Sequence, residues 1–152
     1  MKSQLISIHF LFIKGIHARE WIAPTTALYV IDNLINNRMN IDNDPRFQTT
    51  YYIMPILNPD GYEYSRTSNR MWRKNRSVPP PGSNCYGIDL NRNYDVVGFG
   101  VGASTDPCSE SYKGIKPNTE AEVRAASDVV MRHKDNIRVS LSFHSYGISL
   151  KT

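Results

Sequence analysis

The chain has 152 residues, of which 40% are hydrophobic and 21% are charged. This length corresponds to one ordinary domain, and the composition excludes a disordered tail, a collagen and a low-complexity linker. The 18 Lys and Arg outnumber the 14 Asp and Glu, which gives a mild net charge of +4 that bears on surface attraction rather than on fold. No apolar run reaches the roughly 18 residues of a membrane-spanning helix.

The first apolar segment is Leu5–Ile13, which is rich in Ile and Phe and ends just before Gly15. This pattern predicts a buried strand. A signal peptide over Met1–Ile13 is the alternative, because a lysine precedes the apolar run. No small-x-small cleavage site follows, however, so we expect a strand and no convincing signal peptide within this chain.

A helical pattern follows over Trp21–Asn37. Apolar residues recur in it at a spacing of three to four, and they form one stripe: Ala27, Ile31, Leu34 and Ile35. A polar loop over Asn36–Arg46 then leads to a predicted strand at Thr50–Leu57. The sequence Asn58-Pro59-Asp60-Gly61 that comes next predicts a turn.

The second half of the chain begins with a basic, aromatic segment at Tyr62–Arg76 and two loops at Ser77–Cys85 and Gly98–Pro107. A capping box then predicts a helix start at Thr119, with Glu122 as its partner and Asn118 as a competing cap. This helix should run to about His133 and bury three apolar residues: Val123, Ala126 and Val130. A clean alternation over Ile137–Phe143 predicts the last strand, which ends at His144.

The predicted elements alternate between strands and helices, apart from one long irregular excursion. This order indicates an α/β layered domain, and neither an internal repeat nor a domain boundary is visible.

Two of the four histidines stand at places where α/β sheets carry ligands. His17 and His144 each follow the carboxyl end of a predicted strand, and Glu20 lies three residues after His17. Two imidazoles and one carboxylate suit an open, catalytic zinc site. Ordinary strand-end histidines are the alternative. His9 and His133 have no acidic or cysteine neighbour, which favours a structural or solvated role.

Arginines gather around these positions, at Arg19, Arg70, Arg73 and Arg92. Because a guanidinium group matches a carboxylate, they indicate an anionic group beside the scissile bond. A solvated basic face is one alternative. A nucleic-acid patch with interleaved aromatic residues is another.

Several blocks of this sequence resemble the pancreatic-type zinc metallocarboxypeptidases, the A/B group. The first block, Gly15–Ile22, closely resembles that family's first zinc motif. The later blocks occur in the family's order and cover nearly the whole chain: Asn58–Tyr62, Asn69–Lys74, Gly87–Asn93, Cys108–Glu110 and Ser142–Tyr146. The resemblance implies a zinc-dependent exopeptidase fold, with a mixed sheet and helices on both faces.

The resemblance also implies roles for the residues of a metal centre. His17, Glu20 and His144 would hold one Zn²⁺ per chain, with the fourth position left for water. The metal would polarise the scissile carbonyl and lower the pKa of the water. Asp89 would orient the first zinc histidine, and Arg73 would stabilise the oxyanion of the tetrahedral intermediate.

Substrate binding is implied for five further residues. Asn91 and Arg92 would bind the terminal carboxylate of the substrate, which is what makes such an enzyme an exopeptidase. Arg19, Arg70 and Tyr146 would be outer subsite residues. The partners expected on this basis are the C-termini of peptides and proteins, with neither a nucleic acid nor a membrane involved.

The two cysteines, Cys85 and Cys108, match the disulfide of the same family. The pairing implies an oxidising, extracellular setting, and hence a secreted protein.

In that family the general-base glutamate lies downstream of the third zinc ligand, whereas this sequence stops at Thr152. Residues 1–152 are therefore expected to be a truncated, amino-terminal part of a catalytic domain. The predicted function is zinc-dependent removal of C-terminal residues from peptides. An inactive fragment that keeps the zinc-binding and carboxylate-binding residues is the alternative, and a basic nucleic-acid-binding module is a remote one. Because it lacks the base, this chain alone is expected to hydrolyse peptides poorly.

Overall fold

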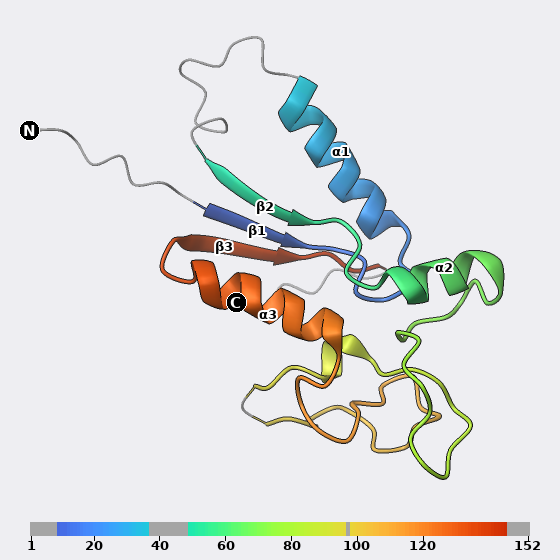
Figure 1. Cartoon of the computed structure of the whole chain (residues 1–152). Helices are drawn as coiled ribbons and strands as arrows, with labels where there is room; N and C mark the ends of the chain where they lie inside the picture. The colour runs from blue at the N-terminus through green and yellow to red at the C-terminus, as the bar shows by residue number, and fades with distance from the viewer. Residues whose placement is uncertain (1–8, 37–48, 97, 146–152) are drawn as a thin grey trace, which may run out of the picture.

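The computed structural model describes residues 9–36, 49–96 and 98–145. Within them, three parallel strands form a sheet, and helices lie on both of its faces (Figure 1). The elements in chain order are β1 (His9–Ile13), α1 (Ile22–Asn36), β2 (Thr50–Met54), α2 (Pro59–Thr67), the 3₁₀ helix η3 (Leu90–Arg92), α3 (Ala121–His133) and β3 (Ile137–Ser142). The expected α/β class is confirmed.

The strand order β2-β1-β3 explains why both faces of the sheet are covered. The connection from β1 to β2 steps across the sheet in one direction, and the connection that ends in β3 steps in the other. Because such crossovers are right-handed, α1 and α3 fall on opposite faces. Every strand pair in the described part of the chain is parallel, so the mixed sheet that we expected is not seen within it.

The central strand β1 is buried on both faces. Leu11 is fully buried and Phe12 is only 9% exposed, although their side chains point in opposite directions. The predicted strand Leu5–Ile13 is thus confirmed over His9–Ile13, and residues 5–8 lie outside the described residues.

Helix α1 and strand β2 differ slightly from their predicted bounds. The residues that α1 buries come from its first half: Ala23, Pro24 and Ala27. Ile35, at the end of the predicted apolar stripe, is 60% exposed. Strand β2 ends at Met54 rather than Leu57, since Pro55 follows it and has no N–H for the sheet ladder.

The predicted turn at Asn58–Gly61 is wrong, because these residues begin helix α2. Asn58 is the N-cap, and its side-chain oxygen accepts a hydrogen bond from the Gly61 N–H at 3.0 Å. Pro59 occupies the first helical position, where a missing N–H costs nothing. Asn, Pro, Asp and Gly are common both in turns and at helix N-termini. Here the residues after Gly61 continue as a helix to Thr67.

The predicted capping box at Thr119 is also wrong. Helix α3 begins at Ala121, and its N-cap residue, Glu120, makes no capping hydrogen bond with its side chain. The Thr119 hydroxyl donates to the Glu120 carboxylate, while Glu122 accepts from the Asn75 amide at 3.3 Å. Both members of the expected box are therefore engaged elsewhere.

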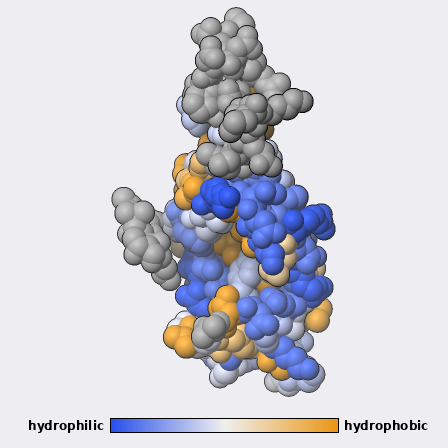
Figure 2. Space-filling view, turned by 90° about the vertical axis from the view of Figure 1, so that its left-hand side faces the viewer, coloured by the Kyte–Doolittle hydropathy of each residue, from blue (hydrophilic) through white to orange (hydrophobic). Residues whose placement is uncertain are grey.

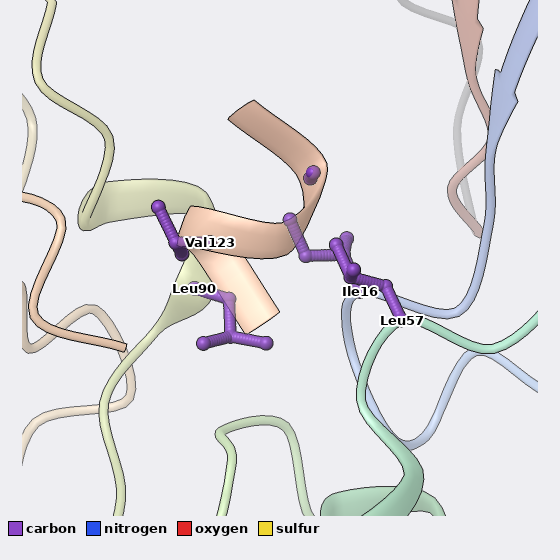
Figure 3. Packing of buried hydrophobic residues seen from close by; sticks show 5 residues of the cluster. Ile16, Leu57, Leu90 and Val123 are labelled. Carbon is purple, nitrogen blue, oxygen red and sulfur yellow. The ribbon is translucent and has the colours of Figure 1, made fainter. Parts of the chain in front are cut away.

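The hydrophobic core lies between α3, η3 and the loops that follow β1 and β2 (Figure 3). Ile16 and Leu57 come from those loops, and they pack near Leu90 and Val123. Of the three residues that α3 was expected to bury, Val123 and Ala126 are fully buried, but Val130 is only partly buried. This core fixes the ends of β1 and β2 against the irregular segment.

Strand β3 is the least covered of the three strands. It spans Ile137–Ser142, so that Phe143 lies just beyond it, and Leu141 is 39% exposed. None of the described helices combines the length and apolar character needed to cross a membrane.

Candidate metal centre

The turn between β1 and α1 brings His17 and Glu20 together. Gly15 opens this turn with a φ of 61°, and a Cβ there would lie 3.3 Å from the Pro55 carbonyl oxygen. A single tight turn follows, in which the Glu20 N–H donates to the His17 carbonyl. Both side chains are buried, and the His17 Nδ1 lies 2.9 Å from the Glu20 Oε1.

His144 follows strand β3 and lies beside His17 and Glu20. Ser142 is paired with Ile13 in the parallel ladder, so the residues beyond both strands leave the sheet side by side. The His144 Nδ1 lies 3.0 Å from the Glu20 Oε2 and 3.1 Å from the His17 Nδ1. One ligand atom from each of the three residues falls within 4.8 Å of the others.

A second carboxylate, Asp89, lies behind His17. It is fully buried, and its Oδ1 lies 3.2 Å from the His17 Nε2. The same oxygen accepts from the Asn91 N–H, so Asp89 also caps the helix η3. Its other oxygen accepts two hydrogen bonds from Arg73, at 2.9 and 3.2 Å. Asp89 thus contacts the His17 imidazole, the Arg73 guanidinium and the backbone N–H of Asn91 at the same time.

At Glu20, His17 and Asp89, interactions with neighbouring side chains outweigh the effect of burial on the pKa. Burial opposes the charge on Glu20, but hydrogen bonds from His144 and His17 lower its pKa to about 2. Burial likewise opposes charge on His17, yet hydrogen bonds with Asp89 and Glu20 raise its pKa. Burial also opposes charge on Asp89, and the His17 hydrogen bond together with the Arg73 charge lowers its pKa. Both carboxylates are therefore ionised at neutral pH.

This donor set fits a zinc ion. When the Nε2 of His17 carries the imidazole proton and donates it to Asp89, the Nδ1 lone pair faces Glu20 and His144. Two Nδ1 atoms 3.1 Å apart need a proton or a cation between them. Two imidazoles and one carboxylate are a familiar ligand set of catalytic zinc sites.

The outer arginines are held by contacts with the protein. Arg19 donates to the Glu110 carboxylate at 2.7 Å and to the Met71 carbonyl at 3.2 Å. Arg70 donates to the Arg19 carbonyl, and its guanidinium lies 3.8 Å from the Trp21 ring centre. Sequence reasoning gave no role to Glu110, and no spacing signal connected it with Arg19.

Helix η3 carries the remaining two candidate residues. The Asn91 side chain is exposed, while Arg92 donates to the carbonyl of Gly102 at 3.1 Å and to that of Asn91 at 3.0 Å. Tyr146 lies outside the described residues.

Cys85 and Cys108 form a disulfide bond, with a Cα–Cα distance of 5.0 Å. The predicted pairing is confirmed. The bond encloses η3 and connects the two loops that flank it.

Comparison with known proteins places the chain in a family. The sequence pattern of the zinc carboxypeptidases matches residues 8–150. The chain belongs to the zinc carboxypeptidase family. Carboxypeptidase B of Astacus astacus is 45% identical to it over 132 residues, which make up 87% of this chain and 43% of the relative. Carboxypeptidase A2 of Rattus norvegicus is 42% identical over 137 residues, which make up 87% of this chain and 32% of the relative.

Solved structures of carboxypeptidases have the same fold. Bovine thrombin-activatable fibrinolysis inhibitor superposes with a TM-score of 0.80 at 38% identity, over 92% of this chain and 46% of that one. Carboxypeptidase A from Helicoverpa armigera superposes with a TM-score of 0.86 at 29% identity, over 95% of this chain and 35% of that one. This zinc carboxypeptidase chain thus spans less than half the length of the relatives it matches.

Proposed function

We propose that residues 1–152 form part of a carboxypeptidase catalytic domain, in which His17, Glu20 and His144 bind one Zn²⁺. The convergence of these three side chains from two distant segments is the observation that carries the proposal. A zinc ion held by these three residues would supply Lewis-acid chemistry at the scissile carbonyl of a peptide. Asp89 fixes the orientation and the proton position of the His17 ring, since it accepts from the Nε2.

Arg73 acts on the developing negative charge of the substrate. Asp89 accepts from its Nε and from one Nη2 hydrogen, which leaves the other N–H groups of the guanidinium for an oxyanion. The ion pair with Asp89 also prevents the side chain from turning away. Arg73 therefore enters the reaction already oriented.

Asn91 and Arg92 bind the terminal carboxylate of the peptide, and Arg19, Arg70 and Tyr146 contact residues farther from the cleaved bond. The substrates are the C-termini of peptides and proteins. The short helix η3 supports this assignment, because Asp89 and the disulfide loop hold it close to the metal ligands. The disulfide also supports an extracellular location.

Zinc titration of the purified chain tests the metal centre. Replacing Glu20→Gln or His144→Asn removes a ligand and should weaken the tight zinc site at least about 100-fold, whereas Asp89→Asn should weaken it about 10- to 100-fold. Glu63→Gln is the matched control, because Glu63 is an exposed acid paired with Arg66 on α2. Equal zinc affinity in the wild type and in the Glu20 variant would contradict the proposal.

Binding of two peptides, one with a free C-terminus and one amidated, tests the substrate. The zinc-loaded chain should bind the peptide with the free C-terminus more tightly than the amidated one. Arg92→Gln should reduce this difference in affinity about 10- to 100-fold, because it removes a hydrogen bond to a charged group. Arg138→Gln, at an exposed position of β3, is the control. Equal binding of both peptides would contradict carboxylate recognition and leave the zinc site standing. Hydrolysis of the free peptide would distinguish an enzyme from a chain that only binds.

A further inference from the structure

We propose that His9, Tyr52 and His133 form a second divalent-metal site, separate from the centre at His17, Glu20 and His144. The three residues come from β1, β2 and the last turn of α3. They lie toward the amino end of β1, roughly 13 Å along the strand from its carboxyl end at a rise of about 3.3 Å per residue. This site does not depend on the proposed carboxypeptidase function.

The sheet register places all three side chains on one face. His9 and Leu11 point to the same side of β1, and Tyr52 is the neighbour of Leu11 in the ladder. Helix α3 covers this face, and the His133 ring stacks on the Tyr52 ring with centres 4.3 Å apart. Figure 2 views the molecule from the side on which the strands begin, and hydrophilic residues predominate on the described surface as a whole, with hydrophobic patches among them. All three residues are partly buried and partly open to solvent.

The two distances from the Tyr52 oxygen are close to those of metal coordination. The Tyr52 hydroxyl lies 3.4 Å from the His9 Nδ1 and 3.1 Å from the His133 Nδ1. Bonds of about 2.0–2.1 Å at a tetrahedral ion place two ligand atoms about 3.3–3.4 Å apart. An ion between the three atoms would bind both imidazole nitrogens and the phenol oxygen at once.

The chemistry favours a borderline transition metal such as Zn²⁺, Ni²⁺ or Cu²⁺. Imidazole suits these ions, whereas Mg²⁺ and Ca²⁺ prefer sites built of oxygen atoms. The carbonyl groups at the end of α3 favour a positive charge beside His133. On binding, the ion forms a bond to the Tyr52 oxygen, and the phenolic proton passes to the solvent without any change of oxidation state.

Zinc titration in a His144→Asn background isolates this site. That chain should retain one zinc equivalent, and addition of His133→Asn or Tyr52→Phe should weaken its binding at least about tenfold. Tyr51→Phe is the matched control, since Tyr51 lies next in β2 and faces the other side of the sheet. Zinc should also produce the ultraviolet difference absorption of an ionised tyrosine, which Tyr52→Phe abolishes and Tyr51→Phe does not.

The wild-type chain provides the same test without the His144 change. It should bind two zinc equivalents, and His133→Asn should remove only the weaker one while circular dichroism shows the fold intact. A wild-type chain that binds one equivalent would overturn the proposal. So would His133 and Tyr52 variants that bind zinc as the Tyr51 variant does, because the cluster would then be a hydrogen-bonded stack alone.

Discussion

Lys14 places an ammonium group inside the protein, where no described residue accepts a hydrogen bond from it. It is fully buried at the end of β1, and its Nζ is the buried side-chain atom that finds no hydrogen-bond partner among the described residues. The Nζ lies over the ring of Phe143 and 5.3 Å from the ring of Phe12. Aromatic faces compensate part of the lost hydration but not all of it. Burial accordingly lowers the pKa of Lys14 to about 8.

This shift predicts a stability that rises with pH. Between pH 8 and 10.5 the unfolded chain holds a proton on Lys14 that the folded chain has released. The free energy of unfolding should therefore increase across that window by at most about 3.5 kcal/mol, since one pKa unit corresponds to about 1.4 kcal/mol. Below pH 8 both states are protonated, and the full cost of burial remains.

Denaturant unfolding at a series of pH values would measure this effect in a comparison with Lys14→Met. The variant should be the more stable protein at pH 7 and should lose the part of the rise that belongs to Lys14. Lys116→Met, at an exposed lysine, should follow the wild type. Parallel curves for the wild type and the Lys14 variant would show that the buried ammonium costs nothing.

The contacts of some individual residues are predictable from the sequence, and those of others are not. The spacing of His17 and Glu20 is local, so one turn of chain was enough to predict their approach. The contact between His17 and Asp89 joins distant segments, and it was expected only through family resemblance. His9 and His133 carried no local signal, because sheet register and a covering helix bring them to Tyr52.

At the scale of elements, Asn58 connects three segments. Besides capping α2, its amide donates to the carbonyl of Ile16 at 3.1 Å and to that of Lys74 at 3.2 Å. The residue is fully buried. It therefore fixes the loop after β1, the start of α2 and the chain that carries Arg73 with respect to one another.

Asn58→Ala should consequently destabilise the fold by about 2–4 kcal/mol. The estimate combines the loss of a helix cap with two buried carbonyl groups left unsatisfied. Urea unfolding followed by circular dichroism would measure it. Asp60→Ala changes an exposed residue in the same helical turn and should cost well under half as much. A similar cost for both variants would indicate that Asn58 acts only through the helix start.

The helices and strands with a long hydrophobic repeat were predicted correctly from that repeat. The alternation before His144 predicted β3 to within one residue, and the spacing of apolar residues predicted α1 to within one residue at its start. Helix α2 has only nine residues and few apolar ones, so its turn-like start was misread. The capping-box prediction is wrong because the side-chain amide of Asn75, more than 40 residues earlier in the sequence, donates hydrogen bonds to both Glu120 and Glu122.

At the scale of the whole molecule, one covalent bond holds the irregular segment. Cys85 and Cys108 are 23 residues apart and enclose η3. A loop of this size corresponds to about 3 kcal/mol of unfolding free energy when its crosslink is removed. The double replacement Cys85→Ala with Cys108→Ala should lose about that amount.

Thermal unfolding with and without a thiol reductant would check this. The reductant should lower the midpoint of the wild type to that of the double variant, and it should leave the variant unchanged. A variant as stable as the oxidised wild type would show that the loop is held by its hydrogen bonds alone. The pairing was expected through family resemblance, because two cysteines allow either one bond or none.

The strand order also governs when this protein can fold during its synthesis. β1 leaves the ribosome well before its second partner, β3, which begins only at Ile137. At roughly 5–20 residues per second the delay lasts on the order of ten seconds, during which Phe10 and Phe12 lie beside an open strand edge. The nascent chain should therefore depend on a holding chaperone in this interval, and the three-residue metal centre can assemble only after His144 has emerged.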